Sequence, residues 1–258
     1  MDRRMRKLGV DKITASYLQL QGVKQHRENV LGFNLLFLNF CGLLPLLGEP
    51  FVFSLFIIAF IPAMIINLWG ILYLVDPYRF ELSFYLYFGI YGFVNTFVLS
   101  ITLVKILYAH LHVSGVWPIM LTLFLVNSLP FVMNWWNYKM LYAGTYAKLQ
   151  HKKDWKIPLW PFLILIAGIG FLRFVSLNGS EAAGMFALFI CIAFFTILTS
   201  YISTNVHKYF FLKKHMELIL KLDPLFGQPK HIQCAREIEM KRRKKYNQKK
   251  KQKSMKEK

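Results

Sequence analysis

The sequence predicts an all-α membrane protein, a polytopic bundle of six transmembrane helices with both termini in the cytoplasm and a basic C-terminal tail. Three observations support this prediction. Hydrophobic residues make up 55% of the 258 residues, although the chain carries a formal net charge of +19. These two properties are separated along the chain, since long apolar runs alternate with short basic segments. In addition, 30 of the 32 Lys and Arg residues fall on one side of such a bundle.

Six apolar runs are long enough, or nearly so, to cross a bilayer core, which takes about 20 residues of α-helix. We expect the spans at residues 30–47, 51–75, 82–104, 116–138, 157–177 and 182–203. No charged residue interrupts the middle of any run, whereas buried helices of a soluble protein would alternate with polar faces. The first run is the shortest, and a hairpin with the second run across 48–50 is the alternative for it.

The positions of the cations predict the orientation of these spans. Lys and Arg near the ends of membrane helices lie preferentially on the cytoplasmic side. With both termini inside, only Lys105 and Arg173 lie near the opposite side, which also favours an even number of spans. We therefore expect an integral protein of the plasma membrane. Residues 1–29 are polar and basic, so we expect the first span, rather than a cleaved signal peptide, to direct insertion.

This topology divides the chain into four parts. We expect a basic N-terminal arm at 1–29 with an interfacial helix, a six-span domain at 30–203, an amphipathic juxtamembrane segment at 204–228, and a polybasic cytoplasmic tail at 229–258. We expect the tail to bind through Lys241, Arg242, Arg243, Lys244, Lys245, Lys249, Lys250 and Lys251. Anionic lipids of the inner leaflet attract each such cation by about 1 kcal/mol. RNA or ribosome contact is an alternative, as is a protein partner on the cytoplasmic side or in the membrane.

Each of the first four spans contains an asparagine well inside it, namely Asn39, Asn67, Asn95 and Asn127. An amide in hydrocarbon needs a partner, and hydrogen bonds between membrane helices are worth about 0.6–2 kcal/mol each. These residues are therefore expected to fix helix neighbours. The alternative is a polar layer that lines a substrate path, although such paths more often contain an ionisable residue.

Two spans contain an interior proline, Pro62 in the second and Pro130 in the fourth. Each proline removes one helical hydrogen bond and frees the carbonyl four residues earlier. Interruptions of this type occur near the binding sites of transporters, but membrane helices also tolerate proline as a simple kink. We expect simple kinks at both positions.

No motif of a catalytic or metal site is present in the chain. GxSxG, Walker-loop and HExxH patterns are absent, and His110 with His112 supplies at most two metal ligands. Cys41, Cys191 and Cys234 are far apart, without the spacing of a metal site or a disulfide framework. We therefore expect no metal, no cofactor and no catalytic activity.

The predicted loops on the outer side are very short, whereas the two cytoplasmic arms are long. Most of the surface that soluble partners could contact is therefore in the cytoplasm. We therefore expect a non-enzymatic component of a membrane transport, secretion or assembly complex. The second hypothesis is a permease subunit for a small solute or a peptide, like ABC exporters in its span number and orientation, with the four asparagines along its path. That likeness concerns architecture alone, because the residue signatures of ABC exporters are absent. A membrane enzyme that acts on lipid is the third hypothesis.

Overall fold

The computed structural model describes residues 14, 17–18, 23–146, 181–222, 226–229 and 232. All its elements within these ranges are helices, and none is a strand. In chain order they are α3 (Val23–Gly32), η1 (Phe33–Leu43), α4 (Leu44–Leu47), α5 (Phe53–Val75), α6 (Glu81–Lys105), η2 (Ile106–His110), α7 (Val116–Tyr142), α10 (Glu181–Ser200), η3 (Tyr201–Thr204), α11 (Asn205–Lys214) and α12 (Met216–Leu222). The predicted all-α class is thus confirmed for this part of the chain.

Five helices within the described ranges are long and apolar enough to cross a membrane. They cover Gln25–Leu47, Phe53–Val75, Glu81–His110, Val116–Tyr142 and Ala183–Lys214. Five of the six predicted spans coincide with these helices, and the predicted span 157–177 lies outside the described residues. The first and last helices are longer than predicted, since α3 begins at Val23 and α11 continues the last helix to Lys214.

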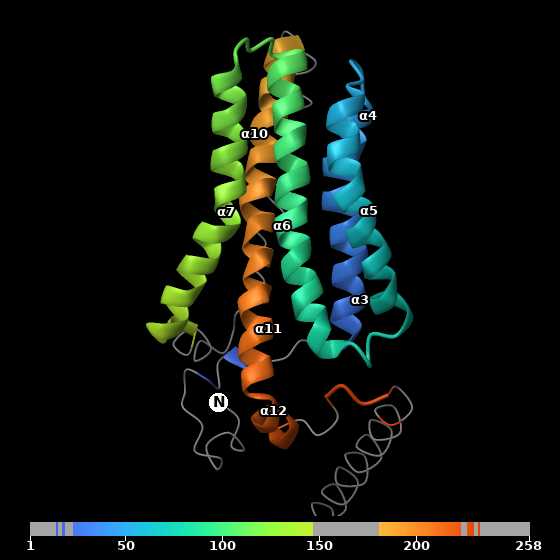
Figure 1. Cartoon of the computed structure of the whole chain (residues 1–258), viewed down its shortest axis with the longest axis vertical. Helices are drawn as coiled ribbons and strands as arrows, with labels where there is room; N and C mark the ends of the chain where they lie inside the picture. Colours follow the sequence, from blue (N-terminus) through green and yellow to red (C-terminus); the bar gives the residue numbers. More distant parts are fainter. Residues whose placement is uncertain are drawn as a thin grey trace, which may run out of the picture.

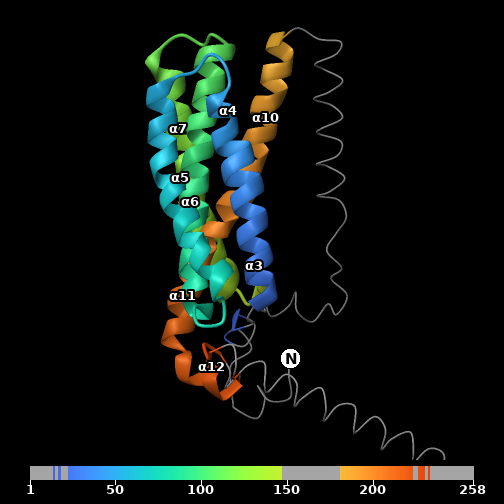
Figure 2. The ribbon, with the colours of Figure 1, turned by 90° about the vertical axis from the view of Figure 1, so that its right-hand side faces the viewer.

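The spanning helices lie side by side along the long axis of the molecule, with α6 among them at the centre (Figures 1 and 2). The loops at 48–52 and 111–115 lie at the upper end in Figure 1, and α12 lies at the lower end. α6 contacts α5, α7, α10, η1, η3 and α11, and most of its side chains are buried. The other helices surround α6 and expose apolar side chains on their outer faces.

The first spanning helix changes its hydrogen bonding partway along. The 11 residues of η1 form a wider π-type helix, and the N–H of Leu44 donates to the carbonyl of Asn39, five residues earlier. Pro45 near the start of α4 removes one backbone donor, and the helix ends at Gly48. Because π-type turns are rare and occur mostly as single turns, η1 is the least regular of the described spanning segments.

Two glycines of α6 permit a close crossing with the last helix. A Cβ atom on Gly92 would lie 2.9 Å from the Cα of Ser203, and one on Gly89 would lie 3.0 Å from the Cα of Val206. Real Cβ atoms essentially never show the first distance, and the second is tighter than nine in ten real Cβ contacts. Small residues allow membrane helices to approach each other in this way.

The fourth predicted span, α7, bends at mid-length, and its lower part leans away from α11 (Figure 1). Pro130 lies inside this helix and is buried. The carbonyl of Pro130 accepts hydrogen bonds from the Asn134 Nδ2 at 2.8 Å and from the Ser203 hydroxyl at 3.3 Å. The bend is therefore tied to η3, directly beside the glycine crossing of α6.

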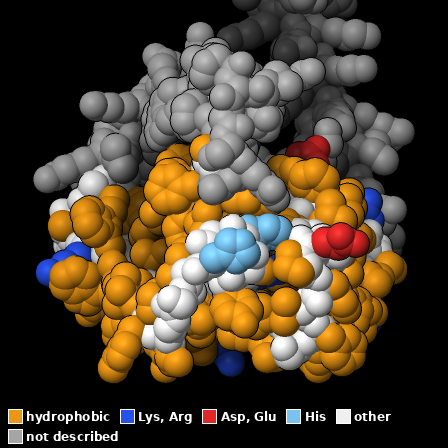
Figure 3. Space-filling model, turned by 90° about the horizontal axis from the view of Figure 1, so that it is seen from above, with side chains coloured by type: hydrophobic (Ala, Val, Ile, Leu, Met, Phe, Trp, Pro, Cys, Tyr) orange, Lys and Arg blue, Asp and Glu red, His pale blue; other side chains and the backbone are white. Residues whose placement is uncertain are grey.

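The outer faces of the bundle are apolar, as a lipid environment requires. Seen from above, hydrophobic side chains surround most of the upper end (Figure 3). Exposed large side chains include Ile61, Ile65 and Leu68 on α5, Trp117, Phe124 and Phe131 on α7, and Phe186 and Ile190 on α10. Such a continuous apolar surface on a soluble monomer would be exceptional, so these faces are those of a membrane-embedded protein.

The glycine crossing yields a stability prediction. We expect Gly92→Ala to lower the free energy of unfolding by about 1–3 kcal/mol, because the new methyl group collides with the backbone of η3. The midpoint of thermal unfolding in detergent measures this change. Gly32→Ala is the matched control, since a Cβ there has no neighbour within 4 Å. Equal midpoints for the two variants would contradict the close crossing.

Candidate functional site

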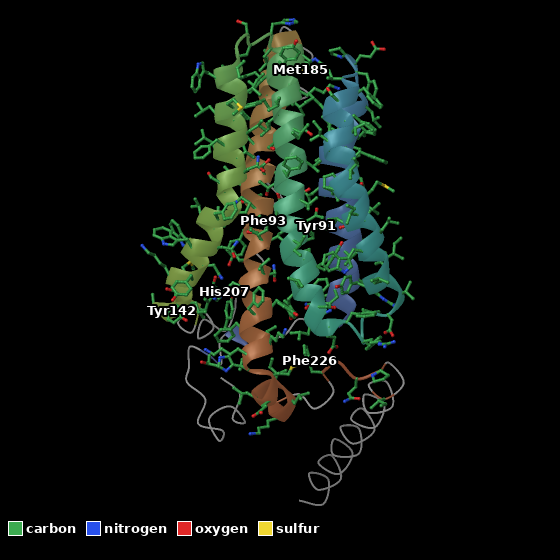
Figure 4. All side chains as sticks on the ribbon, viewed as in Figure 1. Tyr91, Phe93, Tyr142, Met185, His207 and Phe226 are labelled. Carbon is green, nitrogen blue, oxygen red and sulfur yellow. The ribbon has the colours of Figure 1, made fainter. Side chains whose placement is uncertain are left out.

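Most of the polar side chains on one face of α6 donate hydrogen bonds to the first spanning helix. The Tyr87 hydroxyl donates to Asn34 Oδ1 at 3.0 Å, and the Tyr91 hydroxyl donates to the Phe33 carbonyl at 2.7 Å. Further up, the Thr102 hydroxyl donates to the carbonyl of Gly42 at 2.8 Å. Figure 4 shows Tyr91 on the side of α6 that faces this helix. We call Tyr87, Tyr91, Asn95, Thr102 and Lys105 the polar stripe of α6.

Lys105 ends the polar stripe at the upper end of α6. Its ammonium group donates to three backbone carbonyls, those of Pro45 at 2.9 Å, Leu46 at 3.1 Å and Gly48 at 2.5 Å. The residue is only 1% exposed. Three donors thus meet three acceptors at the C-terminus of α4, where the helix dipole also favours a positive charge. Lys105 therefore holds the top of the first helix to α6.

Of the four predicted asparagines, the structure brings Asn39 and Asn67 together. The Asn67 Nδ2 donates to Asn39 Oδ1 at 2.9 Å, and the Asn39 Nδ2 donates to Asn67 Oδ1 at 3.3 Å. Each amide thus satisfies one donor and one acceptor of the other, which ties η1 to α5. Both side chains are partly buried.

The other two asparagines lie in different places. Asn127 on α7 donates to the Ser100 hydroxyl of α6 at 3.0 Å and to the carbonyl of Leu123 at 2.9 Å. Asn95 is fully buried in α6, yet neither its Nδ2 nor its Oδ1 has a hydrogen-bond partner. The four amides therefore belong to separate interfaces. The two predicted proline sites are also separate, since Pro62 lies within α5 and Pro130 within α7.

A chain of hydrogen bonds crosses the lower end, in the fork between the bent part of α7 and α11. The Tyr146 hydroxyl donates to Asn137 Oδ1 at 2.6 Å, and the Asn137 Nδ2 donates to the Tyr17 hydroxyl at 2.9 Å. The Tyr17 hydroxyl lies 3.1 Å from His207 Nδ1, and Tyr146 lies 3.0 Å from Tyr201. We call these five residues the lower-end network. Figure 4 shows His207 on the side of α11 that faces the lower part of α7.

The Asn137 amide determines which hydroxyl groups donate in part of this hydrogen-bonded network. Because Tyr146 gives its proton to Asn137, the Tyr201 hydroxyl is the donor to Tyr146. Tyr17 accepts from Asn137, and the direction of its bond with His207 Nδ1 is set by the tautomer of the imidazole. Gly144, at a φ of 68°, turns the chain after α7 so that Tyr146 can return to Asn137.

Burial raises the pKa of two phenols of the lower-end network, Tyr17 and Tyr146. The pKa of Tyr17 is raised to about 12, chiefly by burial. The pKa of Tyr146 is also raised, first by burial and then by its neighbour Tyr201. Neither phenol is therefore poised to act as a base or a nucleophile near neutral pH. The arrangement suits a structural lock that holds a segment in place.

The lower-end network fastens the N-terminal arm to the bundle, and a hydrophobic cluster does the same beside it. Leu18 from the arm packs with Tyr85, Leu212, Ile219 and Phe226. The N–H of Gly227 also donates to the Glu81 carboxylate at 2.7 Å. Segments from both ends of the chain thus meet beneath α6. We call this assembly of the network, the cluster and α12 the lower-end platform.

His26, in the first turn of the spanning helix, lies against the edge of this platform. Its ring stacks on Phe84 with centroids 3.9 Å apart, and its two nitrogens have no hydrogen-bond partner. The ammonium of Lys208 lies 4.9 Å from the centre of the Tyr85 ring, which His26 also approaches edge-on. A π-stack of this kind supplies packing without satisfying the imidazole nitrogens.

Sequence reasoning identified the midspan amides but missed the lower-end network. Tyr17 and Asn137 are 120 residues apart, so no local pattern joins them. One signal was available on α7, because Pro130, Asn134, Asn137 and Leu141 recur at helical spacing and face the protein. The predicted tail residues 241–251 lie outside the described residues.

The lower-end network predicts that Tyr17→Phe loosens the N-terminal arm. The substitution keeps the ring but leaves the buried Asn137 Nδ2 without its partner, which costs about 1–3 kcal/mol. We expect faster tryptic cleavage within residues 1–29 of the reconstituted protein. Tyr142→Phe is the matched control, because that side chain is 61% exposed. Equal cleavage rates in the two variants would contradict the lock.

Comparisons of this chain with protein-family models, with curated proteins and with solved structures find no match. The functional interpretation of the lower-end platform and of the polar stripe therefore depends on the geometry of the described residues.

Proposed function

We propose that this chain is a non-enzymatic, membrane-embedded component of a transport, secretion or assembly complex. The observation that carries the proposal is the lower-end platform, in which Tyr17 and Leu18 from one arm and Phe226 from the other pack onto the spanning helices. Short extensions of a membrane protein gain little from such ordering unless they present a defined surface, because each ordered residue loses conformational entropy. The platform is such a surface, and we assign it to the cytoplasmic side.

The charges support this orientation. Exposed cations at the lower end include Arg79, Lys139, Lys213 and Lys214, whereas Lys105 at the upper end is buried and bound to carbonyls. Cations outside the membrane core prefer the cytoplasmic side. These charges support a cytoplasmic lower end, and we propose that the membrane is the plasma membrane and that both termini lie on that side.

We further propose six spans. α7 ends at the lower end and α10 begins at the upper end (Figure 1). The chain between them, residues 147–180, has to return across the membrane, and within hydrocarbon a single chain segment does so as a helix. The apolar run at 157–177 is long enough for that crossing. With six spans, the basic tail after residue 229 is on the cytoplasmic side, where anionic lipid or the partner attracts it.

The asparagines support a component more than a permease subunit. Asn39 and Asn67 satisfy each other, and Asn127 is bonded to Ser100 in a different interface. Amides that join neighbouring helices in this way act as packing contacts. A substrate path would instead need several polar groups directed at one continuous space.

The topology predicts where an inserted epitope is accessible. An epitope between residues 150 and 156 is expected to bind antibody only after the cells are permeabilised, whereas one between residues 178 and 180 is expected to bind on intact cells. Binding on the same side for both positions would remove the sixth span. Insertions at 49 and 78, which flank α5, are the matched controls for sidedness.

Site-specific photo-crosslinking tests the component hypothesis. A photoreactive amino acid at Leu220 of α12, which is 42% exposed, is expected to capture a discrete protein partner in the native cell. The same group at Trp117, which is 86% exposed at the opposite end, serves as the control. Mass spectrometry identifies what is captured. A partner captured at position 220 alone supports the platform, and capture of nothing but lipid at both positions contradicts it.

A further inference from the structure

Asn95 interrupts an otherwise continuous set of hydrogen bonds along the polar stripe of α6. The donor below it, Tyr91, reaches the carbonyl of Phe33, and the donor above it, Thr102, reaches the carbonyl of Gly42. Asn95 lies between them and is 0% exposed, but neither polar atom of its amide is paired. Burial of an unpaired amide costs more free energy than the bond would contribute if it were made. The described arrangement is therefore incomplete at this one position.

The π-type helix runs alongside α6 at the level of Asn95. Tyr91 contacts Phe33 and Val98 contacts Gly42, so the middle of η1, with the fully buried Leu38, lies level with Asn95 along α6. In a π-type helix each N–H bonds five residues back, and long runs of this kind are rare. Rewinding the same residues to an α-helix would restore bonds over four residues and a rise of about 1.5 Å per residue. The segment would then lengthen and turn against α6.

The contacts at the two ends of η1 show what such a movement would shift. Lys105 binds the carbonyls of Pro45, Leu46 and Gly48, which directly follow η1 along the chain. A Cβ atom on Gly42 would lie 2.8 Å from the Val98 Cγ1, so the present approach of η1 to α6 requires glycine there. If η1 rewound, the carbonyls that bind Thr102 and Lys105 would therefore move with it. Phe33, at the start of η1, would stay bonded to Tyr91.

We propose that η1 is a two-state element and that Asn95 stabilises its second state. In the described state, η1 is π-type, Thr102 and Lys105 are bonded to it, and Asn95 is unpaired. In the second state, η1 has α-helical bonding, and the Asn95 Nδ2 donates to an acceptor of the rewound segment. The change moves α4 and the loop 48–52 relative to α6. This change couples the pairing of Asn95 at midspan to the position of the loop at the upper end. The coupling does not depend on whether the lower-end platform binds a partner.

Distances between spin labels test this proposal in the full chain, reconstituted in lipid nanodiscs. The labels are attached at Leu47 and Val116, both exposed at the upper end, through a genetically encoded ketone so that the native cysteines remain. The wild type is expected to show two distance populations. Asn95→Leu removes the unpaired amide and is expected to shift their ratio about tenfold toward the described state.

Further variants keep the outcome decisive. Asn95→Ser is expected to act like Asn95→Leu, because a serine can bond to its own helix carbonyl. Thr102→Val and Gly42→Ala are expected to shift the ratio the opposite way, since each weakens the described state. Asn127→Leu, on the opposite interface of α6, is the control and should leave the ratio unchanged. A single population in the wild type that no variant alters, or equal effects of Asn95→Leu and Asn127→Leu, would overturn the proposal.

Discussion

The hydrogen-bond donors on α6 have to find acceptors inside the protein, because hydrocarbon supplies none. This requirement determines where the first helix lies. Tyr87, Tyr91, Thr102 and Lys105 each reach the first helix, mostly at backbone carbonyls. Backbone acceptors are available at every turn, so α6 can bind its neighbour along its whole length without matching polar side chains. The opposite side of α6 packs differently. Its glycines have no side chain, so the backbone of the last helix contacts the backbone of α6 directly.

The two ends of the bundle are built in different ways. At the upper end, a buried cation closes one helix terminus with three carbonyls, and few other polar groups take part. At the lower end, neutral phenols and one amide join segments that are distant in sequence. In a dry setting the low local dielectric strengthens the bonds of such a charge to backbone carbonyls. The lower-end network is neutral, and its central residues Tyr17 and Asn137 are buried, so it holds the N-terminal arm in place at the end at which we propose partner binding.

Much of the fold was predictable because a helix that crosses the bilayer core must be composed mainly of apolar residues. The length of each apolar run predicted the spans, and the predicted bounds of α5 and α6 fall within two residues of the observed helix ends. Helix neighbours were not predictable in the same way. Lys105 does not follow the preference of cations for the cytoplasmic side, because it lies at the upper end of α6. Its hydrogen bonds to the carbonyls at the end of α4 explain this position. The pairing of Asn39 with Asn67, and of Tyr17 with Asn137, depends on which helices adjoin, and no periodicity in a single sequence contains that information.

The last spanning helix runs with little interruption from Glu181 to Lys214. At about 1.5 Å per residue it is about 50 Å long, whereas the bilayer core is about 30 Å thick. Roughly 20 Å of it therefore lies outside the core. At its lower end, where α12 is attached, Leu212 packs with Tyr85 in the second turn of α6. The two helices lie in backbone contact at Gly89 and Gly92, so a tilt of this helix about the crossing would displace α12 relative to α6.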